Sequence, residues 1–270
     1  MAQSVVLDSC VIFPMPLCDT LLRAAEADLY RIHYSQEILD GATRNLIKKR
    51  KMTQEKAARF QQQIIKTFPE GLVQVPEALT EIMTNHPRDR HVLAAAVAAK
   101  VEVIVTANLK HFRSEDLEPW GIEAQHPDAF LINLCEAHGE DSLIELLWKQ
   151  AEDCKNPPIT IIELLNKLTL QTPNFASEIL FSEYSLDVEE IARQALAQFG
   201  NISTDGSRFL EGENYRLNFK KGCLTIVDKL DRGEILKSKN GRLEGKLLVK
   251  DIERFQAFAK ELEQTSKLSK

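Results

Sequence analysis

Two polar side chains of this sequence follow closely on short apolar runs. Asp8 comes directly after residues 4–7 (SVVL), and Asn108 stands two residues beyond residues 101–106 (VEVIVT). Both runs are rich in β-branched residues, which is typical of strands buried on both faces of a parallel sheet. Because open α/β sheets bind their ligands at the carboxyl ends of the strands, we expect Asp8 and Asn108 to line one site.

Two more acidic residues lie on predicted helices that could bring them to the same edge. Asp40 falls in the first turns of a helix over about residues 36–50, which Ser35 caps. Asp89 opens the helix that precedes the second strand, with Pro87 in its first turn. Clustered carboxylates repel one another unless a cation offsets their charge, and oxygen ligands select hard ions such as Mg²⁺ or Mn²⁺. The usual chemistry of such a site is phosphodiester hydrolysis, because the metal polarises the phosphate and yields hydroxide from bound water.

Each of these residues also has an ordinary structural interpretation. Asp8 could cap a turn, and Asn108 could be a turn residue with an unusual backbone angle. Asp40 could be a solvated helix residue, and Asp89 could serve only the dipole of its helix. The joint placement of the four residues favours a site, but their spacing alone leaves both interpretations open.

The wider pattern predicts two parts of different character. Strands alternate with helices over residues 1–130, which indicates an α/β fold with a mostly parallel sheet. The stretch from residue 128 to about 181 predicts helices alone. Beyond about residue 185, a helix is followed by short alternating runs with Lys-Gly and Asn-Gly turns, which predict a small antiparallel sheet, and by a final helix. We therefore expect a first domain over residues 1–184 and a small α+β domain over residues 185–270.

The composition is that of a folded protein. Of the 270 residues, 44% are hydrophobic and 27% are charged, which argues against disorder and low complexity. No apolar run is long enough for a membrane span and no signal peptide is read, so we expect a cytoplasmic protein with no membrane partner. The five cysteines form no CxxC pair, which argues against zinc and disulfide frameworks. A net charge of −6 does not favour general coating of nucleic acid, although a local basic patch could bind it.

A resemblance to a known family rests on three blocks of the sequence. They are VVLDSCVIFPMPLCDTLL at residues 5–22, YSQEILDGATRNLIKKRKMT at residues 34–53 and NHPRDRHVLAAAVAAKVEVIVTANLKHF at residues 85–112. In this order they resemble the PIN-domain nucleases, and in particular the VapC-like branch related to the toxin half of VapBC toxin–antitoxin pairs. The resemblance continues through HPDAFL at residues 126–131 and more loosely to about residue 180.

The resemblance implies a three-layer α/β/α fold around a parallel sheet, dependence on Mg²⁺ or Mn²⁺, and endonucleolytic cleavage of RNA. Asp8 and Asp89 match the family's metal-binding acids, and Asp40 falls where this branch usually has Glu. Glu37 lies three residues earlier on the same helix face and could replace Asp40 as the metal ligand. Asn108 falls where relatives have Asp or Asn, and it would complete the catalytic set.

Further residues have supporting roles in this hypothesis. The hydroxyls of Ser9 and Thr106 could orient Asp8 or a phosphate, and His111, which stands where Asp is common, is at best accessory. Cations beside the acidic cleft would attract the RNA backbone, unless they merely belong to a solvated helix. These cations are Arg44, Lys48, Lys49, Arg50, Lys51, Arg88 and Arg90.

The expected partners follow from the same resemblance. They are an RNA substrate, an antitoxin protein and a second copy of the chain in a homodimer. Residues 185–270 match no family that we recognise, and they could extend the RNA contact, pair protomers or restrain the active site as a built-in inhibitor. The departure at Asp40 keeps an alternative open, in which a PIN-like module has lost catalysis and binds RNA or protein only.

Overall fold

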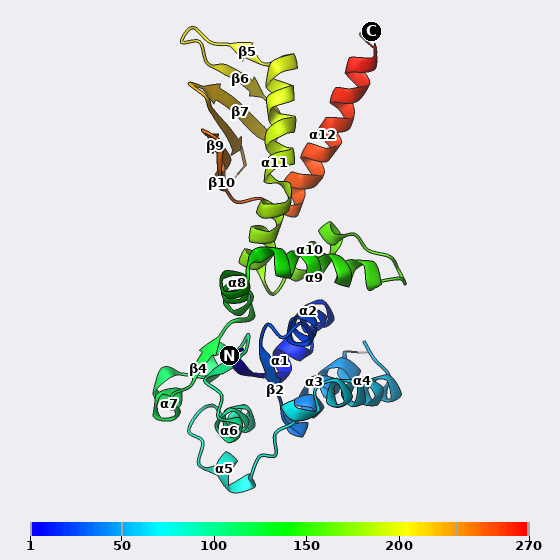
Figure 1. The fold of residues 1–270 in the computed structure, drawn as a ribbon, viewed down its shortest axis with the longest axis vertical. Coiled ribbons are helices and arrows are strands. Elements are labelled where there is room, and N and C mark those ends of the chain that lie inside the picture. The colour runs from blue at the N-terminus through cyan, green and yellow to red at the C-terminus, as the bar shows by residue number, and fades with distance from the viewer. Residues whose placement is uncertain (1, 50, 231, 269–270) are drawn as a thin grey trace. The chain divides into compact units, whose positions relative to one another are not determined.

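The protein is described by a computed structural model, which covers residues 2–49, 51–230 and 232–268. The chain divides into two compact units, residues 1–173 and residues 174–270 (Figure 1). This division lies earlier than the predicted boundary at residue 184, because one uninterrupted helix, α11, runs from Pro173 to Phe199. Within the described ranges, no helix is long and apolar enough to cross a membrane.

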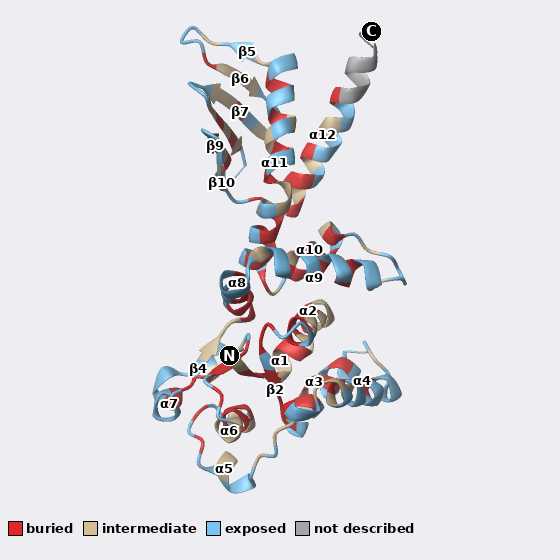
Figure 2. Cartoon of the chain, viewed as in Figure 1, coloured by how far each residue is buried: buried red, intermediate tan, exposed pale blue. Residues whose placement is uncertain are grey.

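A parallel sheet of four strands forms the centre of the first unit, in the order β2-β1-β3-β4. Its strands are β1 (Ser4–Leu7), β2 (Arg31–His33), β3 (Val103–Val105) and β4 (Glu123–Gln125). All strand pairs are parallel, with Val6 opposite both His33 and Ile104. The side chains of β3 and most of those of β1 are buried, as Figure 2 shows in red. Both apolar runs therefore form the buried strands that the sequence predicts.

Helices flank this sheet, which confirms the predicted three-layer α/β/α fold (Figure 1). The helices of this unit are α1 (Ser9–Ile12), α2 (Met15–Glu26), α3 (Gln36–Lys48), α4 (Gln54–Thr67), α5 (Glu77–Glu81), α6 (Arg90–Ala99), α7 (Ser114–Leu117), α8 (Pro127–His138), α9 (Glu140–Asp153) and α10 (Ile161–Leu168), of which α9 and α10 pack on other helices. Three short 3-10 turns, η1 (Pro69–Gly71), η2 (Leu109–His111) and η3 (Glu118–Trp120), complete the unit.

The start of α3 is held firmly against the sheet. The side chain of Ser35 accepts from the backbone N–H of Ile38 at 3.3 Å, which is the predicted cap. The backbone N–H of Tyr34 donates to Gly71 at 2.9 Å. A Cβ atom at Gly71 would lie 2.5 Å from the carbonyl oxygen of Ile32, so only glycine allows this close approach. The acidic residues of α3 are therefore carried by a well-anchored helix.

The second unit consists of two helices and a six-stranded antiparallel sheet, in the order β10-β9-β8-β7-β6-β5. Its elements are α11, β5 (Asn201–Ile202), β6 (Arg208–Glu211), β7 (Tyr215–Lys220), β8 (Cys223–Asp228), β9 (Gly233–Lys239), β10 (Arg242–Gly245) and α12 (Val249–Leu268). Ser238 of β9 donates to Glu189 of α11 at 2.6 Å, and the ring of Tyr215 lies 5.2 Å from that of Phe255 on α12. Both helices thus cover the same face, which confirms the predicted α+β composition.

Two buried carboxylates share one cation in the second unit. Arg232 donates to Asp251 at 2.9 Å and to Asp228 at 2.9 Å. Asp251 also accepts from the hydroxyl of Tyr215 at 2.6 Å. The backbone N–H of Leu230 and the charge of Arg232 lower the pKa of Asp228. This cluster joins the β8–β9 connection to α12.

We expect Arg232→Leu to reduce the free energy of opening of β7 to β9 by roughly 3–5 kcal/mol, because it removes the cation that Asp228 and Asp251 share and leaves Asp228 with Lys250 at 3.8 Å. The pKa of Asp228 is lower in the folded protein than in the unfolded chain. Its carboxylate therefore stabilises the fold fully at pH values above its unfolded pKa, and this stabilisation is lost as the pH falls through the folded pKa. The destabilisation caused by Arg232→Leu should therefore become smaller below about pH 4. Native-state hydrogen exchange of the full chain measures this free energy.

Arg216→Leu is the matched control, since Arg216 pairs with Glu211 on the exposed surface. It should cost at most about 1 kcal/mol. Equal protection in the two variants would contradict the assigned role of Arg232.

Candidate active site

The carboxylate of Asp8 is buried at the carboxyl end of β1, with 3% of the residue exposed. Its backbone N–H donates to Val105 at 3.1 Å, which joins the ends of β1 and β3. The Oδ2 atom accepts from the hydroxyl of Thr106 at 2.7 Å and from the thiol of Cys10 at 3.1 Å. The Oδ1 atom accepts from the hydroxyl of Ser9 at 3.2 Å. Three side-chain donors therefore orient this carboxylate, including both hydroxyls that the sequence analysis named.

The thiol of Cys10 is a contact that the sequence analysis did not identify. Burial, with the charge of Asp8, raises the pKa of the Cys10 thiol to about 12. The thiol therefore stays protonated at neutral pH and can donate to Asp8. Its sulfur also accepts from the backbone N–H of Ala107 at 3.2 Å. The sequence signal for this contact is a cysteine two residues after an acidic residue at the end of a strand. This signal is weak unless the position of the neighbouring strand is known.

Asp89 lies beside the segment that follows β3. The side-chain amide of Asn108 donates to Asp89 Oδ2 at 3.1 Å, and the backbone N–H of Asn108 donates to Thr106 Oγ1 at 3.0 Å. Because Thr106 in turn donates to Asp8, one hydrogen-bonded series runs from Asp8 through Thr106 and Asn108 to Asp89. The structure thus brings three of the four predicted catalytic residues together at the carboxyl edge of the sheet.

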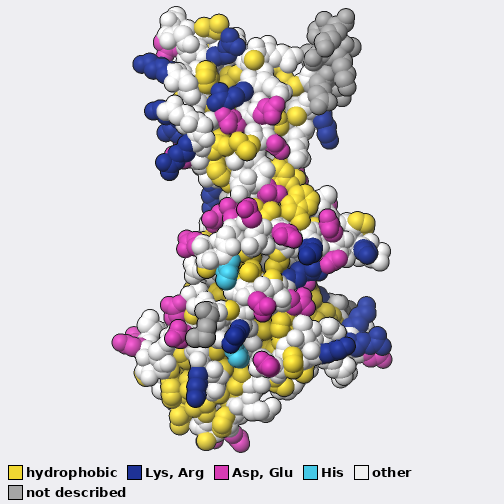
Figure 3. Space-filling model, in the orientation of Figure 1, with side chains coloured by type: hydrophobic (Ala, Val, Ile, Leu, Met, Phe, Trp, Pro, Cys, Tyr) yellow, Lys and Arg dark blue, Asp and Glu magenta, His cyan; other side chains and the backbone are white. Residues whose placement is uncertain are grey.

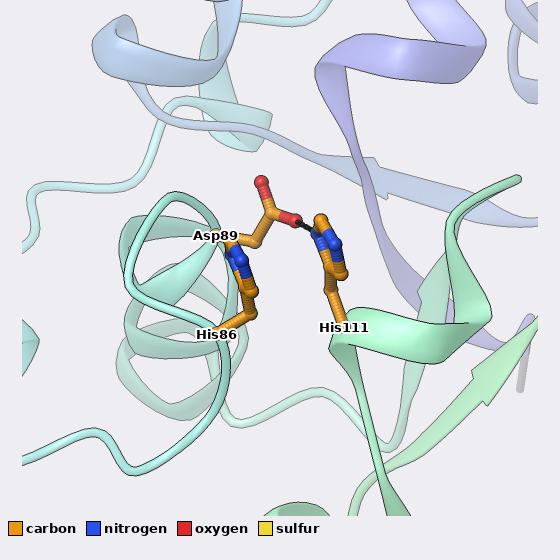
Figure 4. A group of neighbouring side chains, drawn as sticks. All are labelled: His86, Asp89 and His111. Atoms are coloured by element: carbon orange, nitrogen blue, oxygen red, sulfur yellow. Dashed lines mark hydrogen bonds and ion pairs between the residues drawn. The ribbon is translucent and has the colours of Figure 1, made fainter.

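Two histidines extend this group (Figure 4). Nδ1 of His111 lies 2.6 Å from Asp89 Oδ2, and the ring of His86 stacks on that of His111 with centroids 3.7 Å apart. In the tautomer with the proton on Nδ1, His111 donates to Asp89 and its Nε2 lone pair is left for another partner, while the amide nitrogen of Asn108 lies 2.5 Å from the same Nδ1. The sequence predicts only an accessory role for His111 and none for His86, although each lies three residues from a predicted site residue.

The fourth predicted residue, Asp40, is not part of this group. Its exposed carboxylate accepts from Gln36 at 2.9 Å and from Gln61 of α4 at 3.0 Å. Both contacts lie on the surface shared by α3 and α4. This placement corresponds to the structural alternative considered for Asp40, a solvated helix residue.

The α3 helix packs against the Asp8 turn at Gly41. A Cβ atom at Gly41 would lie 3.2 Å from the Cβ of Ser9. Glu37 stands four residues before Gly41, so the two positions share one face of α3. The carboxylate of Glu37 lies 3.9 Å from Nδ1 of His91 on α6, the helix that Asp89 precedes. Of the two acids on α3, Glu37 is therefore the one on the side of the site.

The predicted RNA-binding cations lie mostly on the surface. Arg44, Lys48, Lys49, Lys51 and Arg88 are exposed. Lys49 and Lys51 both reach over the ring of Phe13, with nitrogen-to-centroid distances of 4.6 and 5.3 Å. Arg90 is partly buried and donates to a backbone oxygen at 3.4 Å. Arg50 lies outside the described residues.

The donor set suits a divalent cation. Within the described ranges no lysine, arginine or histidine lies within ion-pair distance of Asp8, although this carboxylate is almost fully buried. A buried carboxylate without a cationic partner is costly, and a bound cation removes that cost. A second group of possible metal ligands consists of His86, Asp89 and His111, each of which offers one ligand atom within 4.8 Å of the others.

Comparison with known proteins agrees with this geometry. A family model described as PIN domain matches residues 4–110, and a model described as VapC50 C-terminal domain matches residues 127–180. "Putative ribonuclease VapC50" from Mycobacterium tuberculosis (strain ATCC 25618 / H37Rv) is 43% identical over 100 residues, which span 37% of this chain and 59% of that relative. No solved structure matches the chain. Together with the parallel sheet and the acidic residues at its edge, these matches show that residues 4–110 are similar to PIN domains and residues 127–180 to a domain of a VapC-type protein.

Proposed function

We propose that this chain is a toxin-like endoribonuclease that hydrolyses RNA phosphodiester bonds with the help of a divalent cation. The observation that carries the proposal is the buried carboxylate of Asp8, linked through Thr106 and Asn108 to Asp89 at the carboxyl edge of the sheet. The PIN-domain match and the similarity to a putative ribonuclease support nuclease chemistry. A cytoplasmic location, an antitoxin partner and a homodimer belong to the same proposal.

The proposed role of the site residues is to bind the cation and to orient one another, more than to react with the RNA themselves. Asp8 and Asp89 would hold the cation, with Asn108 and Nε2 of His111 beside them. A bound divalent cation polarises a phosphate and makes its bound water acidic. Thr106 keeps the Asp8 carboxylate in one orientation, so the site does not have to reorganise when substrate binds. Asn108 holds Asp89 in the same way.

The imidazole of His111 bears on the identity of the metal. Mg²⁺ prefers oxygen ligands, whereas imidazole suits first-row transition ions. A set of two carboxylates and one imidazole therefore favours Mn²⁺ over Mg²⁺. The hydrogen bond from Nδ1 of His111 to Asp89 fixes the orientation of the imidazole ring.

One observation favours a second candidate function. The carboxylate of Asp40 is held by two glutamines on the surface, away from the hydrogen-bonded series of Asp8 and Asp89. A site with one acid fewer would bind metal less tightly. The chain would then be a PIN-like module that binds RNA or protein with little or no catalysis.

We expect Asp8→Asn and Asp89→Asn to lower RNA cleavage by the full chain at least about 100-fold in Mn²⁺, since removal of even an outer partner of a metal ligand costs 10–100-fold. The assay is cleavage of a mixed pool of single-stranded and structured RNA, with EDTA as the metal-free reference. Asp141→Asn, on the exposed first turn of α9, is the control and should cleave as the parent does. Equal cleavage by all four chains would refute the site, and a parent without cleavage in either metal would favour the second candidate.

The two acids of α3 can be separated in the same assay. Glu37→Gln should lower cleavage at least about tenfold, because Glu37 shares a face of α3 with Gly41, which packs against the Asp8 turn. Asp40→Asn should change cleavage less than about twofold, since its amide can still join the contacts with Gln36 and Gln61. The opposite order would show that Asp40 is the ligand on α3.

The proposed role of His111 predicts a change in metal preference. In the parent, Mn²⁺ should support faster cleavage than Mg²⁺, and His111→Asp should reduce the ratio of the two rates at least about fivefold by replacing nitrogen with oxygen. Titration of each metal against the protein without RNA should show the same shift in relative affinity. His138→Asp, on the exposed end of α8, is the control. An unchanged ratio in His111→Asp would exclude His111 as a ligand.

A further inference from the structure

The antiparallel sheet of residues 174–270 has one face that the helices of its own unit leave open. Leu217, Leu224 and Leu236 are buried on the face that α11 and α12 cover. Because side chains alternate along a strand, the neighbouring residues point to the other face. One row on this open face runs across five strands and consists of Phe209, Asn218, Thr225, Lys237 and Glu244. The first four of these are partly exposed, and Glu244 is exposed.

Cations gather at one end of this sheet. The β7–β8 and β9–β10 turns lie side by side there, because Cys223 pairs with both Lys220 and Lys239. Lys239 in turn pairs directly with Arg242, and like charges opposite one another on neighbouring strands destabilise a sheet. Figure 3 shows lysine and arginine side chains grouped over this sheet. We name these cations the basic sheet end; they are Lys220, Lys221, Lys237, Lys239 and Arg242.

Few acids neutralise the basic sheet end. Asp205 pairs with Lys220 at 2.6 Å, and Glu244 pairs with Arg242 at 3.2 Å. For Lys237 and Lys239, no acidic side chain of the described residues lies within ion-pair distance. The patch thus keeps an excess of positive charge in a chain whose net charge is −6. A local excess of this kind in an acidic protein fits a polyanion bound at one place.

The open face that carries Lys237 also offers an aromatic ring. Phe209 stands in the same row as Lys237, with Asn218 and Thr225 between them. A nucleic acid strand presents phosphates to cations and unstacked bases to aromatic rings, and amide and hydroxyl groups can bind its base edges. An acidic peptide would use the cations but not this arrangement of ring and polar groups.

We propose that the basic sheet end and the adjoining open face bind single-stranded RNA. In describing this RNA as a substrate, the inference rests on the proposed function, but the binding itself does not depend on cleavage. The second unit would then add affinity for RNA through contacts to phosphates at the turns and to bases at Phe209. Such affinity would depend strongly on salt.

The test is fluorescence anisotropy of a labelled single-stranded RNA of mixed sequence with the full chain in EDTA, where cleavage does not interfere. Lys237→Glu with Lys239→Glu should weaken binding at least about tenfold and reduce the slope of log affinity against log salt by about 1–2. Phe209→Ala should weaken binding about tenfold with little change in that slope. Circular dichroism checks that each variant is folded.

Lys149→Glu with Lys260→Glu is the matched control, because it changes the net charge equally at exposed positions on α9 and α12. An equal loss of binding in this control would show a general charge effect and overturn the proposal. Binding by the Lys237 and Lys239 variant as strong as in the parent would also overturn it, as would complete displacement of RNA by polyglutamate at equal charge concentration.

The result of this binding test can be distinguished from the result of the cleavage test of the proposed function. A parent that cleaves RNA, together with a Lys237 and Lys239 variant that binds RNA normally, would refute this inference alone. A parent that binds RNA through the basic sheet end and shows no cleavage in Mn²⁺ or Mg²⁺ would refute the nuclease and leave the inference standing.

Discussion

The hydrogen bond from Thr106 to Asp8 is the contact on which the site depends. It exists because β1 and β3 are parallel neighbours in register, which places the residue after Val105 beside the residue after Leu7. The same hydroxyl accepts from the backbone of Asn108 and so fixes the turn that carries the amide to Asp89. Strand pairing that buries only apolar side chains thus determines the position of every polar group at the sheet edge. Exposed loops alone would not hold a carboxylate in one orientation.

The sequence predicted this part of the molecule well for a physical reason. An apolar run of β-branched residues has few alternatives to a buried strand, and a polar residue at its end must lie at the edge of the sheet. The positions of Asp8, Thr106 and Asn108 follow from this rule together with the strand order. The hairpins of the second unit were predictable in the same way, from the Lys-Gly and Asn-Gly turns between short alternating runs.

The sequence was less informative where the answer depends on the rotation of a helix. Asp40 and Glu37 lie on one amphipathic helix, and a spacing of three residues does not reveal which of them is directed toward a neighbouring turn. The packing of Gly41 on Ser9 decides this orientation, and the contact joins residues far apart in the chain. The role of Cys10 and the stacking of His86 on His111 depend on similar contacts across the sheet edge. No local pattern in the sequence contains that information.

Charge presents the remaining constraint on the proposed nuclease. Acidic residues that bind a cation also repel the phosphates of RNA, and the whole chain carries a net charge of −6. A bound divalent cation offsets the repulsion only over a short range, because salt screens charges beyond about 10 Å. Affinity for a long polyanion must therefore come from cations placed elsewhere on the chain. In the proposed function, the exposed lysines that follow α3 and the basic sheet end would supply such cations, and the acidic remainder of the surface would limit binding to these places.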